Sequence, residues 1–106
     1  MAWTYLIFAG LLEVVWAFAM KLSVGFTRPL PAAVTILAMI LSFGLLSLAM
    51  RVLPLGTAYM IWTGIGAVGA FLVGVVVLGE SLSAARIIAA LLIIAGLALM
   101  KIATPA

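Results

Sequence analysis

The chain has 106 residues, of which 70% are hydrophobic and 7% are charged, and its mean hydropathy is +1.57. A soluble domain is typically about half apolar and about a quarter charged, so this composition excludes a soluble globular protein and indicates a membrane protein. The five Lys and Arg residues give a net charge of +3 but are scattered along the chain, which argues against a nucleic-acid partner. The sequence has no Cys and no His, and we expect no disulfide, no metal and no cofactor.

The charged residues divide the chain into apolar runs, each long enough to cross a bilayer as a helix, which takes roughly 20 residues. Segments within lipid must be helices or closed barrels, and these runs are too long and too uniformly apolar for barrel strands. We therefore predict an all-α membrane protein with four transmembrane helices, at about Trp3–Met20, Ala32–Met50, Leu55–Leu78 and Ala84–Met100.

The first run has a competing interpretation, because Ala17-Phe18-Ala19 resembles the cleavage site of a signal peptide. No positively charged segment precedes the run, however, and Glu13 lies inside it. Both features are atypical of a signal peptide, and we expect the first helix to remain in the mature protein.

Short connections with turn and cap residues link the runs. Pro31 suits the first position of the second helix, Gly79 suits a helix stop, and Ser83 suits the N-cap of the fourth helix. Glu80 and Arg86 are interpreted as solvated loop charges. No convincing repeat or linker interrupts the chain, so we predict a single transmembrane domain over residues 1–106.

The distribution of Lys and Arg between the two ends of the spans predicts how the protein is oriented in the membrane. With four spans the two termini share one side, together with Arg51 and Lys101. The opposite side carries Lys21, Arg28 and Arg86. Because the Lys and Arg bias of short loops sets orientation, this near balance predicts that both orientations are made and pair as an antiparallel, dual-topology homodimer. The alternative is that the side with three charges is cytoplasmic in every copy.

Small residues within the spans mark places where helices could approach each other. Ala89 and Gly96 are candidate dimer contacts on the fourth helix, although packing within one subunit would explain them equally well. Gly64 and Gly66 are close together inside the third helix, where paired glycines commonly cause bends. They form a candidate hinge.

Glu13 is the only acidic residue within the predicted spans. A charged side chain at bilayer depth costs on the order of 3 kcal/mol, which a structural position could avoid with leucine. Burial favours the protonated form of a carboxyl group, while the ionised form can hold a cation. One carboxylate cannot bind a proton and a cation at the same time. We therefore predict that the protein uses Glu13 to exchange a proton for a cation by alternating access.

Other side chains are suited to surround this carboxylate. Gly10 and Trp16 share a helix face with Glu13, because they lie three residues before and after it. Tyr59 and Trp62 offer donors and aromatic faces for a cation. Ser42 either lines the same site or bonds back to its own helix, as serines within helices often do.

Three extended segments resemble one family: AGLLEVVWAFAMKLSVGFTR (residues 9–28), LPLGTAYMIWTGIGAVGA (53–70) and LGES (78–81). They are similar to the small multidrug resistance transporters, and within these to the guanidinium exporter subtype. The resemblance implies an antiparallel, dual-topology homodimer in the cell inner membrane. This dimer would export guanidinium, with small substituted guanidinium or quaternary ammonium cations as an extension of its substrate range, against an inward flow of protons.

The resemblance also implies roles for particular residues. Glu13 corresponds to the membrane glutamate that binds proton and substrate. Trp16 and Ser42 are expected to bond the carboxylate, and Tyr59 and Trp62 to shape the pocket. Gly10 matches the same binding-site pattern, whereas the role of Lys101 stays open.

Alternatives to a guanidinium exporter remain at this point. A broad-specificity exporter of quaternary ammonium and polyaromatic drugs is the nearest one, followed by a cation channel or a passive membrane assembly subunit. An enzyme is the least supported class, because no histidine, cysteine or second acid within the spans completes a catalytic set.

Overall fold

The computed structural model describes residues 1–104, so the last two residues of the expected 1–106 domain lie outside the described residues. The described part contains four helices, α1 (Ala2–Leu22), α2 (Pro29–Ala49), α3 (Leu55–Val76) and α4 (Ala84–Ala103). At 1.5 Å per residue each is about 30 Å long, which matches the hydrocarbon core of a bilayer. All four are apolar enough to cross a membrane. The predicted all-α, multi-pass membrane fold is therefore confirmed.

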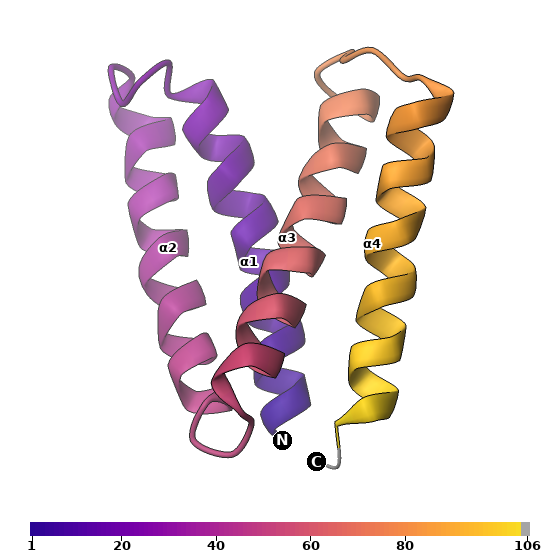
Figure 1. Ribbon diagram of the computed structural model, residues 1–106. Coiled ribbons are helices and arrows are strands. Elements are labelled where there is room, and N and C mark those ends of the chain that lie inside the picture. The colour runs from indigo at the N-terminus through magenta and orange to yellow at the C-terminus, as the bar shows by residue number, and fades with distance from the viewer. Residues whose placement is uncertain (105–106) are drawn as a thin grey trace.

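The helices form two pairs that converge at one end and separate toward the other (Figure 1). Helix α1 packs against α2 and α3, and α4 packs against α3. The termini and the α2–α3 connection lie at the converging end, whereas the α1–α2 and α3–α4 connections lie at the open end (Figure 1). Arg51 and Lys101 consequently lie at one end of the molecule, opposite Lys21, Arg28 and Arg86.

The second helix begins earlier than predicted. Pro29, and not Pro31, is the first helical residue, and Arg28 before it has the extended conformation of an N-cap (φ −100°, ψ 117°). The residue before a proline is pushed toward extended conformations, so Pro29 fixes the boundary. Pro31 is tolerated two residues later because the first N–H groups of a helix have no intrahelical partner.

The predicted signals around the α3–α4 connection are confirmed. Gly79 follows the end of α3 with a φ of +69°, a left-handed conformation that favours glycine. The Ser83 hydroxyl accepts a hydrogen bond from the backbone N–H of Arg86 at 3.2 Å, as expected of an N-cap. The start of α4 is therefore fixed locally.

The buried apolar core lies at the converging end of the molecule. It joins the first half of α1 to the second half of α2 and the first half of α3, through Leu6, Ala9, Leu46, Ala49, Leu53, Ala58, Ile61 and Trp62. No residue in the described part of α4 is buried. The Lys101 ammonium stands 4.3 Å from the centre of the Trp3 ring, so a cation–π contact links the end of α4 to α1. The helices are therefore held together mainly at the converging end of the molecule.

Candidate functional site

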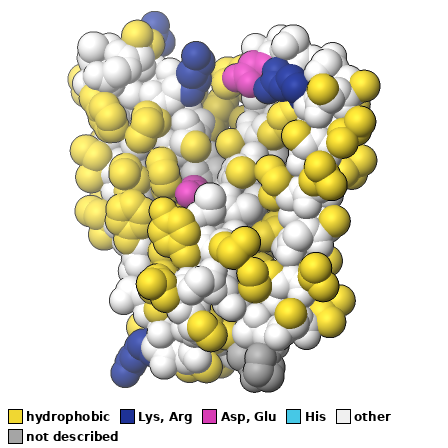
Figure 2. All heavy atoms as spheres, viewed as in Figure 1, with side chains coloured by type: hydrophobic (Ala, Val, Ile, Leu, Met, Phe, Trp, Pro, Cys, Tyr) yellow, Lys and Arg dark blue, Asp and Glu magenta, His cyan; other side chains and the backbone are white. Residues whose placement is uncertain are grey.

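Glu13 lies near the middle of α1 and faces α3. Its carboxylate lies directly against Gly66, where the Cβ of any larger residue would collide with Oε1. The absence of a side chain at Gly66 therefore makes room for the carboxylate between the two helices. Figure 2 shows an acidic side chain at mid-height of this face, among hydrophobic side chains and far from the basic side chains at either end.

Two polar atoms of α1 stand out in this region. Among residues 1–104, Oε1 of Glu13 and Nε1 of Trp16 are the buried side-chain atoms with no hydrogen-bond partner. Buried polar groups are normally paired, because an unpaired one loses its solvation without compensation. One of the two atoms is an acceptor and the other a donor, and their residues are three positions apart on one helix face.

Ser42 connects the three core helices by hydrogen bonds. Its hydroxyl donates to the carbonyl oxygen of Ala9 in α1 at 2.7 Å. It also accepts from Nε1 of Trp62 in α3 at 3.0 Å. The alternative that Ser42 bonds back to its own helix is therefore wrong. The expected bonds from Ser42 and Trp16 to the Glu13 carboxylate are absent within residues 1–104. The Ser42 proton is donated to Ala9 instead, whereas Nε1 of Trp16 has no partner.

Four aromatic rings form a continuous row beside these bonds. Phe43 makes edge-to-face contacts with Trp16 on one side and with Trp62 on the other, with ring centres 6.3 and 5.8 Å apart. Tyr59 continues the row, with its ring centre 5.5 Å from that of Trp62. Phe43 was not predicted from the sequence. It follows Ser42 directly in an apolar run, and helical periodicity places adjacent residues on different faces, so no sequence signal marks it.

Two further glycines allow close helix packing. A Cβ at Gly10 would lie 2.6 Å from Cγ2 of Ile65, and one at Gly64 would collide with Leu97. Gly10 therefore brings α1 close to α3, and Gly64 brings α3 close to α4. Helix α3 is continuous through both Gly64 and Gly66, so the predicted hinge stays a prediction.

A cavity of about 280 Å³ lies between α1 and α3 at the open end of the molecule. Ala17 and Ala70 line it, and each lies one helical turn from Glu13 or Gly66. Lys21 and Glu80 line the same cavity toward the loops. The cavity between α1 and α3, called the α1–α3 cavity below, therefore extends from the loop region toward the Glu13 carboxylate.

Comparison with known proteins gives the same family as the resemblance. The family model described as "Small Multidrug Resistance protein" matches residues 1–94. The chain belongs to the small multidrug resistance family. It is 56% identical over 104 residues to proteins named "Guanidinium exporter" from Citrobacter freundii and Salmonella typhimurium, covering 98% of this chain and 99% of each relative. A protein of the same name from Yersinia pseudotuberculosis is 54% identical over 104 residues, which cover its whole length.

In this member of the family, most of the predicted site residues lie close together, whereas the two predicted dimer contacts on α4 lie apart from them. Side chains from α1, α2 and α3 gather around the Ser42 bonds and the aromatic row, namely Trp16, Ser42, Tyr59 and Trp62, with Glu13 on the same face of α1 as Trp16. Ala89 and Gly96 lie on the exposed surface of α4. Their role as dimer contacts stays a prediction.

Proposed function

We propose that this protein is a proton-coupled antiporter that exports guanidinium, with Glu13 binding the proton and the cation in mutual exclusion. The buried, unpaired Oε1 of Glu13 is the observation that carries the proposal. The relatives named as guanidinium exporters support the choice of substrate. A transporter of this kind moves its substrate unchanged, so the proposal includes no enzymatic step.

The chemistry follows from the surroundings of the carboxylate. An ionised carboxylate held between apolar helices lacks the solvation that water would give it, and either a proton or a cation compensates for that loss. Guanidinium is planar and presents N–H donors in a fork that matches a carboxylate edge. Protonation of Glu13 removes the negative charge and releases the cation. Binding and release are therefore linked to proton movement.

The neighbouring residues shape the pocket. Because Ser42 ties Trp62 to the backbone of α1, the indole of Trp62 is held as a fixed wall. Tyr59 and Phe43 hold that buried indole edge to face, and their own rings are exposed and suited to contact a cation. The unpaired N–H of Trp16 is suited to orient a carboxylate, either that of Glu13 or that of a second subunit. Gly10 sets the spacing of α1 and α3.

An antiparallel homodimer completes the proposed transporter. Three positive charges at one end of the molecule against two at the other bias orientation weakly, so both orientations would be made. The exposed face of α4, with Ala89 and Gly96, would form the contact between subunits. Two Glu13 carboxylates would then face one cavity, and bending at Gly64 and Gly66 would expose that cavity to each side in turn.

Vesicles that contain the purified protein test this function. An outward guanidinium gradient should drive protons in the opposite direction, detected with a pH-sensitive dye on one side of the membrane. A polyaromatic cation at the same concentration serves as the comparison and should drive little proton movement. Stronger proton movement with the polyaromatic cation would assign the protein to drug export, and guanidinium flux without proton movement would indicate a channel.

Replacing Gly66 with Ala is expected to slow guanidinium transport by about tenfold or more. The added methyl group would occupy the position of the Glu13 carboxylate and displace it from its site. The displaced carboxylate would lose a hydrogen bond to guanidinium, and a hydrogen bond to a charged group is worth about 1.5–3 kcal/mol. Since about 1.4 kcal/mol corresponds to a tenfold change in affinity, the loss of one such bond accounts for the expected effect. The initial rate of proton movement in the same vesicles measures the effect.

Gly44→Ala is the matched control for this substitution. Gly44 also lies inside a helix, but a Cβ there would meet no neighbour within 4 Å. Both substitutions raise helix propensity by about the same amount, up to about 1 kcal/mol, so a general effect on the helices would appear in both. Equal rates for Gly66→Ala and Gly44→Ala would show that the room at Gly66 is not needed.

A further inference from the structure

Glu80 is held at the outer end of the α1–α3 cavity. Its backbone N–H donates to the carbonyl oxygen of Gly74 at 2.9 Å. Its carboxylate folds back over the same glycine, where an added Cβ would lie 2.8 Å from the carboxyl carbon. Because Gly74 has no side chain, Glu80 turns toward α3 and lines the cavity together with Lys21. The interpretation of Glu80 as an ordinary solvated loop charge is therefore incomplete.

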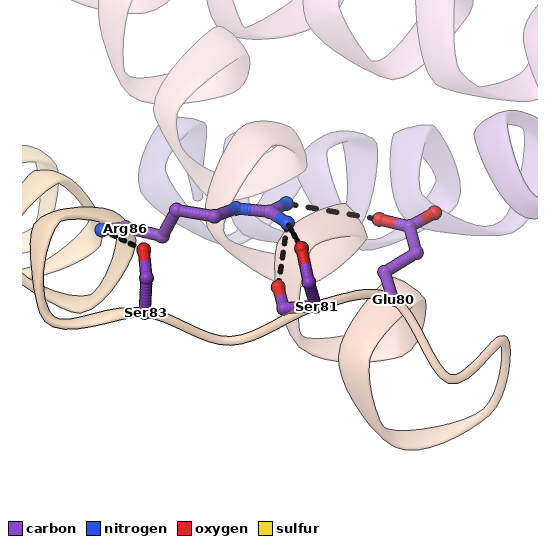
Figure 3. Close-up of polar contacts among 4 residues, drawn as sticks. All are labelled: Glu80, Ser81, Ser83 and Arg86. Atoms are coloured by element: carbon purple, nitrogen blue, oxygen red, sulfur yellow. Dashed lines mark hydrogen bonds and ion pairs between the residues drawn. The ribbon is translucent and has the colours of Figure 1, made fainter.

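Arg86 places a guanidinium group beside this carboxylate (Figure 3). Its Nη1 donates to the carbonyl oxygen of Ser81 at 2.6 Å and to the Ser81 hydroxyl at 3.2 Å. Its Nη2 lies 3.8 Å from Oε1 of Glu80, and its Cζ lies 5.3 Å from the centre of the Phe71 ring. A carboxylate, a carbonyl oxygen and an aromatic face thus surround one guanidinium group. These partners would serve a free guanidinium ion in the same way.

The ion pair between Glu80 and Arg86 is loose enough to exchange. A distance of 3.8 Å is longer than a hydrogen bond, and both side chains are about two-fifths exposed. Partly exposed ion pairs of this kind contribute little to stability. The second carboxylate oxygen of Glu80 points away from Arg86 (Figure 3). Another cation can therefore compete for Glu80 at little cost to the fold.

The residues around the Arg86 guanidinium lie next to the cavity that extends toward Glu13. Phe71 lines the α1–α3 cavity as Glu80 does, and the cavity continues to Ala17 and Ala70, one turn from Glu13 and Gly66. Arg86 lines a neighbouring pocket between α3 and α4 that shares Phe71 with this cavity. A cation that replaces Arg86 at Glu80 would thus lie beside the cavity that extends toward the central carboxylate. The ammonium of Lys21 lines the same cavity and repels cations, which keeps this binding weak and release rapid.

We propose that Glu80, Phe71 and Ser81 form a peripheral guanidinium-binding site beside the α1–α3 cavity, in which the Arg86 side chain acts as a tethered competitor. The inference rests on the proposed export of guanidinium. The incoming ion displaces Arg86 from Glu80, occupies the outer site and then moves toward Glu13. The site raises the local concentration of substrate before the central, proton-linked binding step.

Substitutions of the two partners should change guanidinium transport in opposite directions. Glu80→Gln removes the carboxylate and is expected to raise KM for guanidinium by about twofold to fivefold. Arg86→Gln removes the competing charge but keeps a donor for the Ser81 carbonyl, and is expected to lower KM by a similar factor. If the pair were merely structural, both substitutions would break it and shift KM in the same direction, which would overturn the proposal.

A binding measurement separates this inference from the proposed function. In a Glu13→Gln background, titration calorimetry with guanidinium chloride reports sites other than Glu13. The variant that also carries Arg86→Gln should bind guanidinium, and adding Glu80→Gln should remove that binding. Equal heats from the two variants would overturn the peripheral site whatever the role of Glu13. Transport that persists in Glu13→Gln would instead contradict the proposed function, while the calorimetry would still decide whether Glu80 binds the ion.

Discussion

Replacing Glu13 with Gln is expected to abolish both guanidinium-driven proton movement and guanidinium exchange. Glutamine has nearly the size of glutamate and keeps hydrogen-bonding atoms, but it neither ionises nor carries a proton. The space against Gly66 would therefore stay filled, while both binding partners of the carboxylate would be lost. Proton movement and the uptake of labelled guanidinium into vesicles measure the two activities separately.

Glu80→Gln is the matched control, because Glu80 is the only other acidic residue of the chain. The same substitution there should weaken transport through KM and leave the coupling between guanidinium and protons in place. Coupled transport by Glu13→Gln would contradict the central role of this carboxylate. Loss of proton movement with retained guanidinium exchange would show that Glu13 handles the proton while another group holds the cation.

Locking the membrane orientation is expected to inactivate the protein when one locked form is expressed alone. Two lysines added to the loop after Lys21 would raise the positive charge at the end that already carries three of the five basic residues. The Lys and Arg bias then favours a cytoplasmic location for that loop in nearly every copy. Such copies lack an oppositely oriented partner, so two Glu13 carboxylates could not share an antiparallel cavity.

A second variant with lysines added beside Arg51 and Lys101 should be locked in the opposite orientation and be equally inactive by itself. Coexpression of the two variants should restore guanidinium transport, because each supplies the orientation that the other lacks. Labelling of an introduced loop cysteine from one side of the membrane checks the orientation of each variant. Full transport by either locked variant alone would contradict the antiparallel dimer and favour a parallel assembly.

Both predictions depend on an uneven distribution of packing in the subunit. The core is concentrated at the converging end of α1, α2 and α3, whereas α4 has no buried residue in its described part. Apolar side chains of α4 can face lipid without cost, because lipid tails are as apolar as they are. The exposed face of α4 therefore permits a partner helix without requiring one, and the orientation experiment decides whether such a partner is needed.

The sequence by itself determined that the protein lies in a membrane and has four helices, and it singled out Glu13 as the candidate site residue. Apolar runs of about 20 residues can cross a bilayer only as helices, whatever their neighbours, so the fold class required no tertiary information. Glu13 was equally evident, because a carboxylate at bilayer depth is too costly for a purely structural position. Local rules likewise identified the Ser83 cap and the glycine at residue 79.

Only the tertiary structure decided which partners the site residues have. Ser42 was predicted to bond the Glu13 carboxylate, but its hydroxyl donates to the backbone carbonyl of Ala9 instead. Gly66 was predicted as a hinge, and its contact with Glu13 became visible only once α1 and α3 were packed. Phe43 and the cavity at Glu80 were not predicted at all. Helical periodicity assigns residues to faces within one helix, whereas contacts between helices depend on their crossing and rotation, which the packing of side chains sets.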